Sequence, residues 1–240
     1  MTDIAVDRYA IYFFPDPQSL LARLGQDWLG RSVEMATGEG QPPGELGPDL
    51  PPDIWRKATA MPRTYGFHAT LKAPFRLAAG QSRETLQQAV AKLASGLVPF
   101  ALPPLQVAAL GGFLALCLGE PSIEMDALAD RCVMDLDTFR APLTAAERAK
   151  RRPERLTARQ RRHLDRWGYP YVREDFLFHM TLTGSLPEEV RDTVAPIVRR
   201  LMAPLGQTTH RVDRLSLFHQ SQPGGPFVMI RQFPLQREPG

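Results

Sequence analysis

The feature that most constrains this chain is a five-residue phrase that occurs twice. Phe67-His-Ala-Thr-Leu71 and Phe178-His-Met-Thr-Leu182 both follow the pattern F-H-x-T-L, and the two histidines lie 111 positions apart. On a β-strand, residues two apart share a face, so each histidine lies beside its threonine while phenylalanine and leucine point the other way. The repetition predicts a duplicated scaffold that brings two equivalent imidazoles into one site.

The same order of elements surrounds each copy: a strand, a helix, a long insert, the histidine strand, a second helix and another strand. Alternating and helical patterns of apolar residues predict these elements. In the first half they cover residues 8–15, 18–29, 31–63, 65–75, 83–97 and 105–110. In the second half they cover residues 112–119, 122–136, 140–173, 176–184, 188–202 and 210–218, and a last strand covers 227–233.

These patterns predict an α+β fold of two pseudo-symmetric lobes, each an antiparallel-rich sheet backed by helices. A central cleft lined by the two histidine strands lies between the lobes in this interpretation. We expect a single domain over residues 1–240, with repeat units at about 6–110 and 112–235. A chain of 240 residues with 43% hydrophobic content is long enough to bury the core that such a domain needs.

The start of the chain has no basic segment before an apolar run, and no stretch approaches 18 uninterrupted apolar residues. These observations predict a cytoplasmic protein with no membrane span. Cys117 and Cys132 lie in apolar or amphipathic stretches and are expected to be reduced, buried packing residues.

The charge of the chain is mildly basic. A net charge of +3 permits an anionic substrate without demanding nucleic acid. Between Arg148 and Arg166, nine bases stand against two acids, which indicates either a surface that faces phosphate or the solvated side of a helix. The first insert is rich in glycine and proline, so part of it is expected to have little regular structure. Both inserts lead directly into a histidine strand, which places their ends beside the expected site.

Two imidazoles that titrate near neutrality can supply a base that takes a proton from water and an acid that protonates a leaving oxygen. We therefore predict that His68 and His179 are catalytic. Thr70 and Thr181 are expected to donate hydrogen bonds to phosphate oxygens. Near-identical motifs do not tell which histidine is the base. The sequence contains no HExxH, no Cys-x-x-Cys and no carboxylate cluster, so neither a metal nor a cofactor is expected.

Lys72 lies two residues after Thr70, so strand geometry predicts that its ammonium shares the site face. The other residues predicted to bind substrate are aromatic or basic residues near the ends of strands and inserts: Tyr12, Arg63, Tyr65, Tyr169, Tyr171 and Arg173. The alternative for each is a packing role for the tyrosine or a surface role for the arginine. His163, His210 and His219 have no counterpart in the other half and are expected to have packing or surface roles.

The paired motifs resemble the 2H phosphoesterase superfamily, which includes RNA 2',3'-cyclic phosphodiesterases and related tRNA-end enzymes. His68, Thr70, His179 and Thr181 match its H-x-[ST] pattern residue for residue. A longer match looks like the DUF1045 family, which is associated with phosphonate metabolism. This match lies at residues 8–12, 65–76, 139–144 and 167–172.

The resemblance implies metal-independent hydrolysis of a small cyclic phosphodiester, and the phosphonate association suggests a phosphorylated ribose 1,2-cyclic phosphate. An RNA end that carries a 2',3'-cyclic phosphate is an alternative substrate; it would require a basic groove with exposed aromatics. A second alternative is a non-catalytic protein that binds a phosphorylated metabolite. Two groups that titrate near pH 7 argue against it, because binding alone needs only donors.

Overall fold

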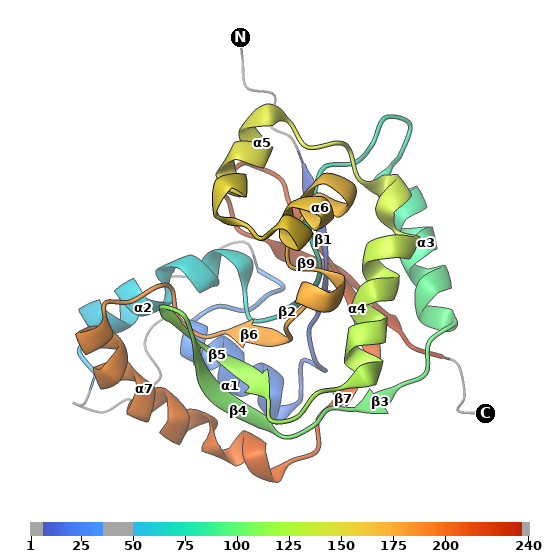
Figure 1. The fold of residues 1–240 in the computed structure, drawn as a ribbon. Helices are drawn as coiled ribbons and strands as arrows, with labels where there is room; N and C mark the ends of the chain where they lie inside the picture. The colour runs from blue at the N-terminus through green and yellow to red at the C-terminus, as the bar shows by residue number, and fades with distance from the viewer. Residues whose placement is uncertain (1–6, 36–49, 237–240) are drawn as a thin grey trace.

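A computed structural model of the chain describes residues 7–35 and 50–236. Seven strands form one antiparallel sheet in the order β4-β5-β6-β2-β1-β8-β9 (Figure 1). Their bounds are β1 (Arg8–Phe13), β2 (Ala69–Phe75), β4 (Leu105–Leu110), β5 (Phe113–Leu118), β6 (His179–Thr181), β8 (Arg214–Gln220) and β9 (Val228–Pro234). Two short strands, β3 (Phe100–Ala101) and β7 (Arg211–Val212), pair separately. The expected α+β class with antiparallel sheet backed by helices is confirmed.

Helices pack against this sheet on both sides of its centre. Their bounds are α1 (Leu20–Leu29), α2 (Pro52–Tyr65), α3 (Arg83–Ser95), α4 (Ile123–Asp135), α5 (Ala145–Lys150), α6 (Ala158–Trp167) and α7 (Glu188–Met202). Five of them begin at a serine or threonine whose hydroxyl accepts a hydrogen bond from a backbone N–H of the first turn. These N-caps are Ser19, Ser82, Ser122, Thr144 and Thr157.

The strand order is symmetric about the junction of β2 and β6, because corresponding strands of the two predicted units follow on each side. On one side β1 and then β8 follow β2, and on the other side β5 and then β4 follow β6. Because β8 comes from the second half of the chain and β4 from the first, each predicted unit contributes a strand to the other unit's side. This order supports the interpretation as two repeat units, which stays a prediction.

Helices likewise pack on strands of the other predicted unit. α3 packs on β8 and β9, α4 packs on β2, and α7 packs on β4 and β5. The Trp28 indole of α1 donates to the Leu182 carbonyl just after β6. Gly25 of α1 lies directly on the motif residue Phe67, since a Cβ at Gly25 would lie 2.2 Å from that ring. The helix can approach the histidine strand this closely only because this position has no side chain.

The two histidine strands are neighbours in one sheet rather than strands that face each other across a cleft. Their only registered pair among the described residues is Ala69 with Met180. The second strand is also shorter than the predicted 176–184, because a 3-10 turn at Arg173–Asp175 precedes it. After Thr181, the backbone N–H groups of Leu182 and Thr183 both donate to the Leu114 carbonyl.

The inserts contain helices that the sequence patterns did not predict. In the first insert, the glycine-rich and proline-rich part expected to be irregular falls on residues 36–49, which lie outside the described residues. α2 follows, with Pro52 in its first turn, where a missing N–H costs nothing. The second insert contains α5 and α6 and is held to the end of β2. There, Leu77 bridges to Arg140, and the Arg76 guanidinium binds both carboxylate oxygens of Glu147 at 2.9 Å.

Within the described ranges, no helix is both long and apolar enough to cross a membrane. The two cysteines are free and buried, as expected for packing residues.

Candidate active site

The histidines and threonines of the two motifs lie on one face of the sheet, which we call the site face. The Ala69–Met180 pair is the centre of the arrangement. Because the strands are antiparallel, this register turns His68 toward Thr181 and Thr70 toward His179. Tyr12 of β1 lies opposite Thr70 and therefore shares the site face. The pairing thus gathers the four predicted catalytic residues, although they lie in two distant parts of the sequence.

His68 is held by three contacts. Its Nδ1 lies 2.8 Å from the Gly66 carbonyl, and its Nε2 lies 3.2 Å from the Thr70 hydroxyl. The ring stacks on Tyr12, with centroids 3.6 Å apart and an interplanar angle of 18°. Since a carbonyl only accepts, Nδ1 carries the proton and Nε2 offers its lone pair toward Thr70. His68 is therefore oriented with its basic nitrogen on the site face.

His179 repeats one of these contacts and lacks the stack. Its Nδ1 lies 2.8 Å from the Leu177 carbonyl, again two residues before the histidine. Its nearest aromatic neighbour is Phe113, tilted at 5.9 Å, and its partner on β5 is Cys117. The same carbonyl contact in both motifs leaves Nε2 as the reactive nitrogen of each imidazole.

The two histidines differ in their surroundings. The pKa of His68 is lowered to about 3, chiefly by burial and to a smaller extent by the charges of His179 and Arg31. The hydrogen bond to Gly66 opposes this shift without reversing it. His68 is thus neutral at pH 7, and a positive charge on His179 favours that neutral form.

Three of the predicted tyrosines gather beside His68. Tyr12 is buried, and burial raises its pKa well above the ordinary value, with further contributions from Tyr65 and Tyr169. Tyr65 stacks on Phe227 at 5.5 Å, and the same Phe227 ring lies 6.2 Å from Tyr12. No described residue hydrogen-bonds to the Tyr12 hydroxyl. Tyr171 is the outermost of the set, 48% exposed, with its ring edge against Tyr169 at 5.6 Å.

Lys72 does not lie on the site face, which corrects the prediction from strand alternation. The register of β1 with β2 shifts after Tyr12–Thr70, so that the next pair is Ile11 with Lys72. Leu71 is the extra residue of a β-bulge, and the bulge turns Lys72 toward α4. There its ammonium donates to the Val133 carbonyl at 2.9 Å and lies 3.4 Å from Asp137. Burial lowers the pKa of Lys72 to about 8, against the effect of Asp137.

Arg63 also has a structural position rather than one in the site. Its guanidinium donates to the Leu29 carbonyl and to the Thr59 hydroxyl, and it covers the Trp55 ring at 4.6 Å. These contacts join α2 to the end of α1. The predicted role in substrate binding does not agree with this placement, because Nε and Nη2 of Arg63 already bind groups of α1 and α2.

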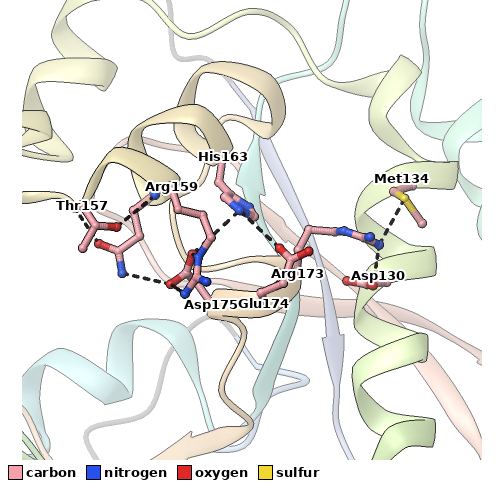
Figure 2. Close-up of polar contacts among 9 residues, drawn as sticks. Asp130, Met134, Thr157, Arg159, His163, Arg173, Glu174 and Asp175 are labelled. Atoms are coloured by element: carbon pink, nitrogen blue, oxygen red, sulfur yellow. Dashed lines mark hydrogen bonds and ion pairs between the residues drawn. The ribbon is translucent and has the colours of Figure 1, made fainter.

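Arg173 is likewise committed elsewhere, to a polar cluster shown in Figure 2. Its guanidinium binds the Asp130 carboxylate of α4 at 2.5 Å. In the same cluster, His163 of α6 lies 3.5 Å from Glu174 and 3.8 Å from Asp175, which agrees with the packing role expected for His163. The cluster fixes the turn before β6, and its ion pair directs the Arg173 guanidinium toward α4.

Two arginines near the site were missed as individual residues. Arg31 is buried and donates to the carbonyls of Met35, Arg63, Thr64 and Phe227, which fixes the backbone just before Tyr65 and at Phe227. Arg151, at the end of α5, lies over the Tyr169 ring at 4.9 Å. Arg151 belongs to the basic stretch noted in the sequence, where nothing distinguishes it from its neighbours. Nothing in the sequence indicates that Arg31 is buried, because an arginine is ordinarily expected at the surface.

Metal ligands do not cluster in the part of the chain that the structure describes: no three His, Cys, Asp or Glu side chains gather there. A small cavity of about 20 Å³ lies at the end of β2, between Lys72, Trp167 and Tyr169. It has room for roughly one water molecule. Neither histidine lines it, so it is separate from the paired motifs.

Comparison with known proteins identifies the family. The model of DUF1045, described as a protein of unknown function, matches residues 70–228. This range includes Thr70, the whole second motif with His179 and Thr181, and the whole second insert. The chain belongs to the DUF1045 family. The first histidine lies just before the matched range.

Two curated relatives extend the family match over nearly the whole chain. Ribose 1,5-bisphosphate phosphokinase PhnN of Janthinobacterium sp. (strain Marseille) is 39% identical over 235 residues, which are 96% of this chain and 51% of that protein. The protein of the same name from Laribacter hongkongensis (strain HLHK9) is 33% identical over 224 residues, 93% of this chain and 51% of that protein. This DUF1045 chain thus spans about half the length of these relatives.

Solved structures that resemble the chain are more distant. Escherichia coli LigT in complex with ATP is 13% identical, with a TM-score of 0.44 over 97% of this chain and 99% of that chain. Kluyveromyces marxianus Usb1 is 12% identical, with a TM-score of 0.38 over 97% of this chain and 100% of that chain. At these scores the likenesses carry no argument about the DUF1045 site, which depends on its own geometry.

Proposed function

We propose that this DUF1045 protein is a phosphodiesterase that opens a small cyclic phosphodiester with two histidines and no metal. The observation that carries the proposal is the Ala69–Met180 pairing, which places two H-x-T motifs side by side on one face. Both imidazoles are fixed by a carbonyl at Nδ1, so both present Nε2 to the same space. A base and an acid held in this way are what hydrolysis of a phosphodiester requires.

We assign the two roles from the environments of the histidines. His68 is neutral, so its Nε2 takes a proton from the attacking water as the water oxygen bonds to phosphorus. His179, in its protonated form, gives its Nε2 proton to the departing sugar oxygen as the old phosphorus–oxygen bond breaks. Thr70 and Thr181 donate hydrogen bonds to the non-bridging oxygens, where negative charge increases in the transition state. One proton is taken and one is given, so the pair returns to its starting state after the protons re-equilibrate with solvent.

The substrate that we propose is 5-phosphoribosyl 1,2-cyclic phosphate. Its support is chemical and comes from the relatives, whose name specifies ribose 1,5-bisphosphate. Cleavage of the bond from phosphorus to O2 of this substrate yields ribose 1,5-bisphosphate. In those relatives, the region outside the match would then use the product of the matched half. His179 is accordingly the group that protonates O2.

The test is hydrolysis of three substrates by wild type and His179→Ala in the presence of EDTA: 5-phosphoribosyl 1,2-cyclic phosphate, a nucleoside 2',3'-cyclic monophosphate and an oligoribonucleotide with a cyclic phosphate end. Phosphorus NMR identifies the products. We expect wild type to convert the first substrate to the 1,5-bisphosphate and the variant to lose about 10²- to 10⁴-fold in kcat.

Two outcomes would contradict the proposal. Preference for the oligoribonucleotide would favour an RNA-end enzyme. Failure to hydrolyse any substrate, combined with measurable binding in both proteins, would favour a binding protein.

A further inference from the structure

Two arginines near the site have no acidic partner among the described residues. Arg8, at the start of β1, donates from Nε to the Gln220 side-chain oxygen at 2.7 Å, and its guanidinium lies over the Phe227 ring at 5.4 Å. Arg151 lies over the Tyr169 ring at 4.9 Å. Among residues 7–35 and 50–236, no carboxylate forms an ion pair with either one.

Two other arginines of the same stretch pair with carboxylates. Arg148 pairs with Asp165 at 2.8 Å, and Arg159 pairs with Asp175 at 2.8 Å. Arg151 is partly buried and rests on an aromatic ring instead, which leaves the edge of its guanidinium for another acceptor. A guanidinium that is stacked and lacks a carboxylate is well suited to bind phosphate.

The fold brings Arg8 and Arg151 to the same end of the sheet. Tyr9 of β1 pairs with Phe75 at the end of β2, so Arg8 lies at that end. The second insert is anchored there by the Arg76–Glu147 ion pair, and Glu147 lies one helical turn before Arg151. Figure 1 shows α5 and α6 at the end of the sheet where β1 begins.

Tyrosines occupy the space between these arginines and His68. Tyr12 stacks on His68, and Tyr12 and Tyr65 both lie against the Phe227 ring that also carries Arg8. The charges of Arg8 and Arg151 both lower the pKa of Tyr12 against the effect of burial, which places both guanidinia within electrostatic range of its hydroxyl. Tyrosine rings thus lie between His68 and the two arginines, Arg8 and Arg151.

We infer that Arg8 and Arg151, with the Tyr12 hydroxyl, form a subsite for a second, non-reacting phosphate monoester of the same small substrate. This inference rests on the proposed function, because it assigns the reacting phosphate to the H-x-T motifs. A phosphate monoester carries up to two negative charges and three acceptor oxygens, which matches two guanidinia and a phenol.

The experiment compares two substrates that differ only in the second phosphate, ribose 1,2-cyclic phosphate and its 5-phosphorylated form. The proteins are wild type, Arg151→Gln, Arg8→Gln and the control Lys150→Gln, which removes an exposed charge next to Arg151. We expect the ratio of kcat/KM for the phosphorylated over the unphosphorylated substrate to fall about 10- to 100-fold in each arginine variant. The ratio in Lys150→Gln is expected to stay within about twofold of wild type, as for a screened surface charge.

A parallel measurement separates failure of this subsite from failure of the proposed function. Calorimetry with ribose 5-phosphate as the probe should give weaker binding in Arg151→Gln and unchanged binding in Lys150→Gln. If wild type hydrolyses neither cyclic phosphate but the arginine variants bind the probe more weakly, the proposed function fails and the subsite stands. An equal loss on both substrates, or unchanged ratios and unchanged probe binding, would overturn the subsite.

Discussion

The two copies of F-H-x-T-L have the same residues but different surroundings. His68 stacks on Tyr12, lies near Arg31 and has a pKa lowered to about 3, whereas His179 has only a tilted phenylalanine nearby and a cysteine as its cross-strand partner. The backbone holds both rings by the same contact, so the difference comes from what the neighbouring strand presents. A duplicated motif can thus place the same residue in two unlike environments, because pairing with different strands changes the surroundings of each imidazole.

Exchange of either histidine for glutamine should produce the largest effect and should expose the difference in role. We expect each variant to lose about 10²- to 10⁴-fold in kcat on a sugar cyclic phosphate. On a diester with a nitrophenolate leaving group, which departs without a proton, His179→Gln should lose much less and His68→Gln should lose as much as before. Equal losses of both variants on both substrates would contradict the assignment of base and acid.

Gly66 supports only the first motif, so its substitution should affect one half of the pair. Its φ of 77° and ψ of 170° are strained for other residues, and a Cβ there would lie 2.8 Å from Val33. Gly66→Ala should cost about 1–3 kcal/mol in the free energy of unfolding, measured with urea, and should lower kcat because the Gly66 carbonyl orients His68. Gly80→Ala is the matched control, since Gly80 has a φ of 79° with nothing within 4 Å of the added Cβ. A cost no larger than that of Gly80→Ala would show that the contact with Val33 is not constraining.

Tyr12 is the neighbour that we hold responsible for much of the shift at His68. Tyr12→Leu opens the stacked face to water, so the pKa of His68 should rise toward its ordinary value near 6.5. Because the base must be neutral, the activity of Tyr12→Leu relative to wild type should fall about threefold to tenfold between pH 7.5 and 5.5. Tyr12→Phe keeps the ring and should show no such additional pH dependence. The same pH profile in both variants would assign the shift to other groups.

Lys72 lies two positions after the first threonine, where the second motif has Thr183, and its substitution should affect activity least. Its ammonium lies on the face toward α4, so Lys72→Met should keep kcat/KM within about twofold, as expected for a side chain outside the site. The same buried ammonium has a lowered pKa, so the unfolded state binds more protons between about pH 8 and 10.5. Stability should therefore rise with pH in that window for wild type and not for Lys72→Met. A tenfold loss of kcat/KM would return Lys72 to the site.

Much of the fold could be predicted because its signals are local. Helical periodicity and N-caps such as Ser122 placed α1, α3, α4 and α7, and alternation placed β1, β4, β5 and β9 close to their observed bounds. α2 was missed because the proline-rich and glycine-rich composition of its insert masks the helical pattern that begins at Pro52. The short β6 was overestimated because Phe176 and Leu177 alternate as in a strand but follow a 3-10 turn.

The site was only partly predictable, because its details depend on contacts between distant segments. The motifs identify four residues, and the fold brings those four together. A bulge at Leu71 depends on how β1 pairs with β2, so no pattern in residues 67–75 indicates that Lys72 turns away. Likewise, the hydrogen bonds of Arg63, the ion pair of Arg173 and the lack of an ion pair at Arg151 depend on residues from other elements.

The most direct test of the account is a titration of both imidazoles by nitrogen-15 NMR, with His68→Gln and His179→Gln used to assign the signals. The account predicts that the His68 ring stays neutral, with the proton on Nδ1, from pH 8 down to about pH 4, since its pKa is about 3. Protonation of His68 with a midpoint near 6.5 would contradict the claim that the two motifs have become unlike, and with it the assignment of His68 as the base.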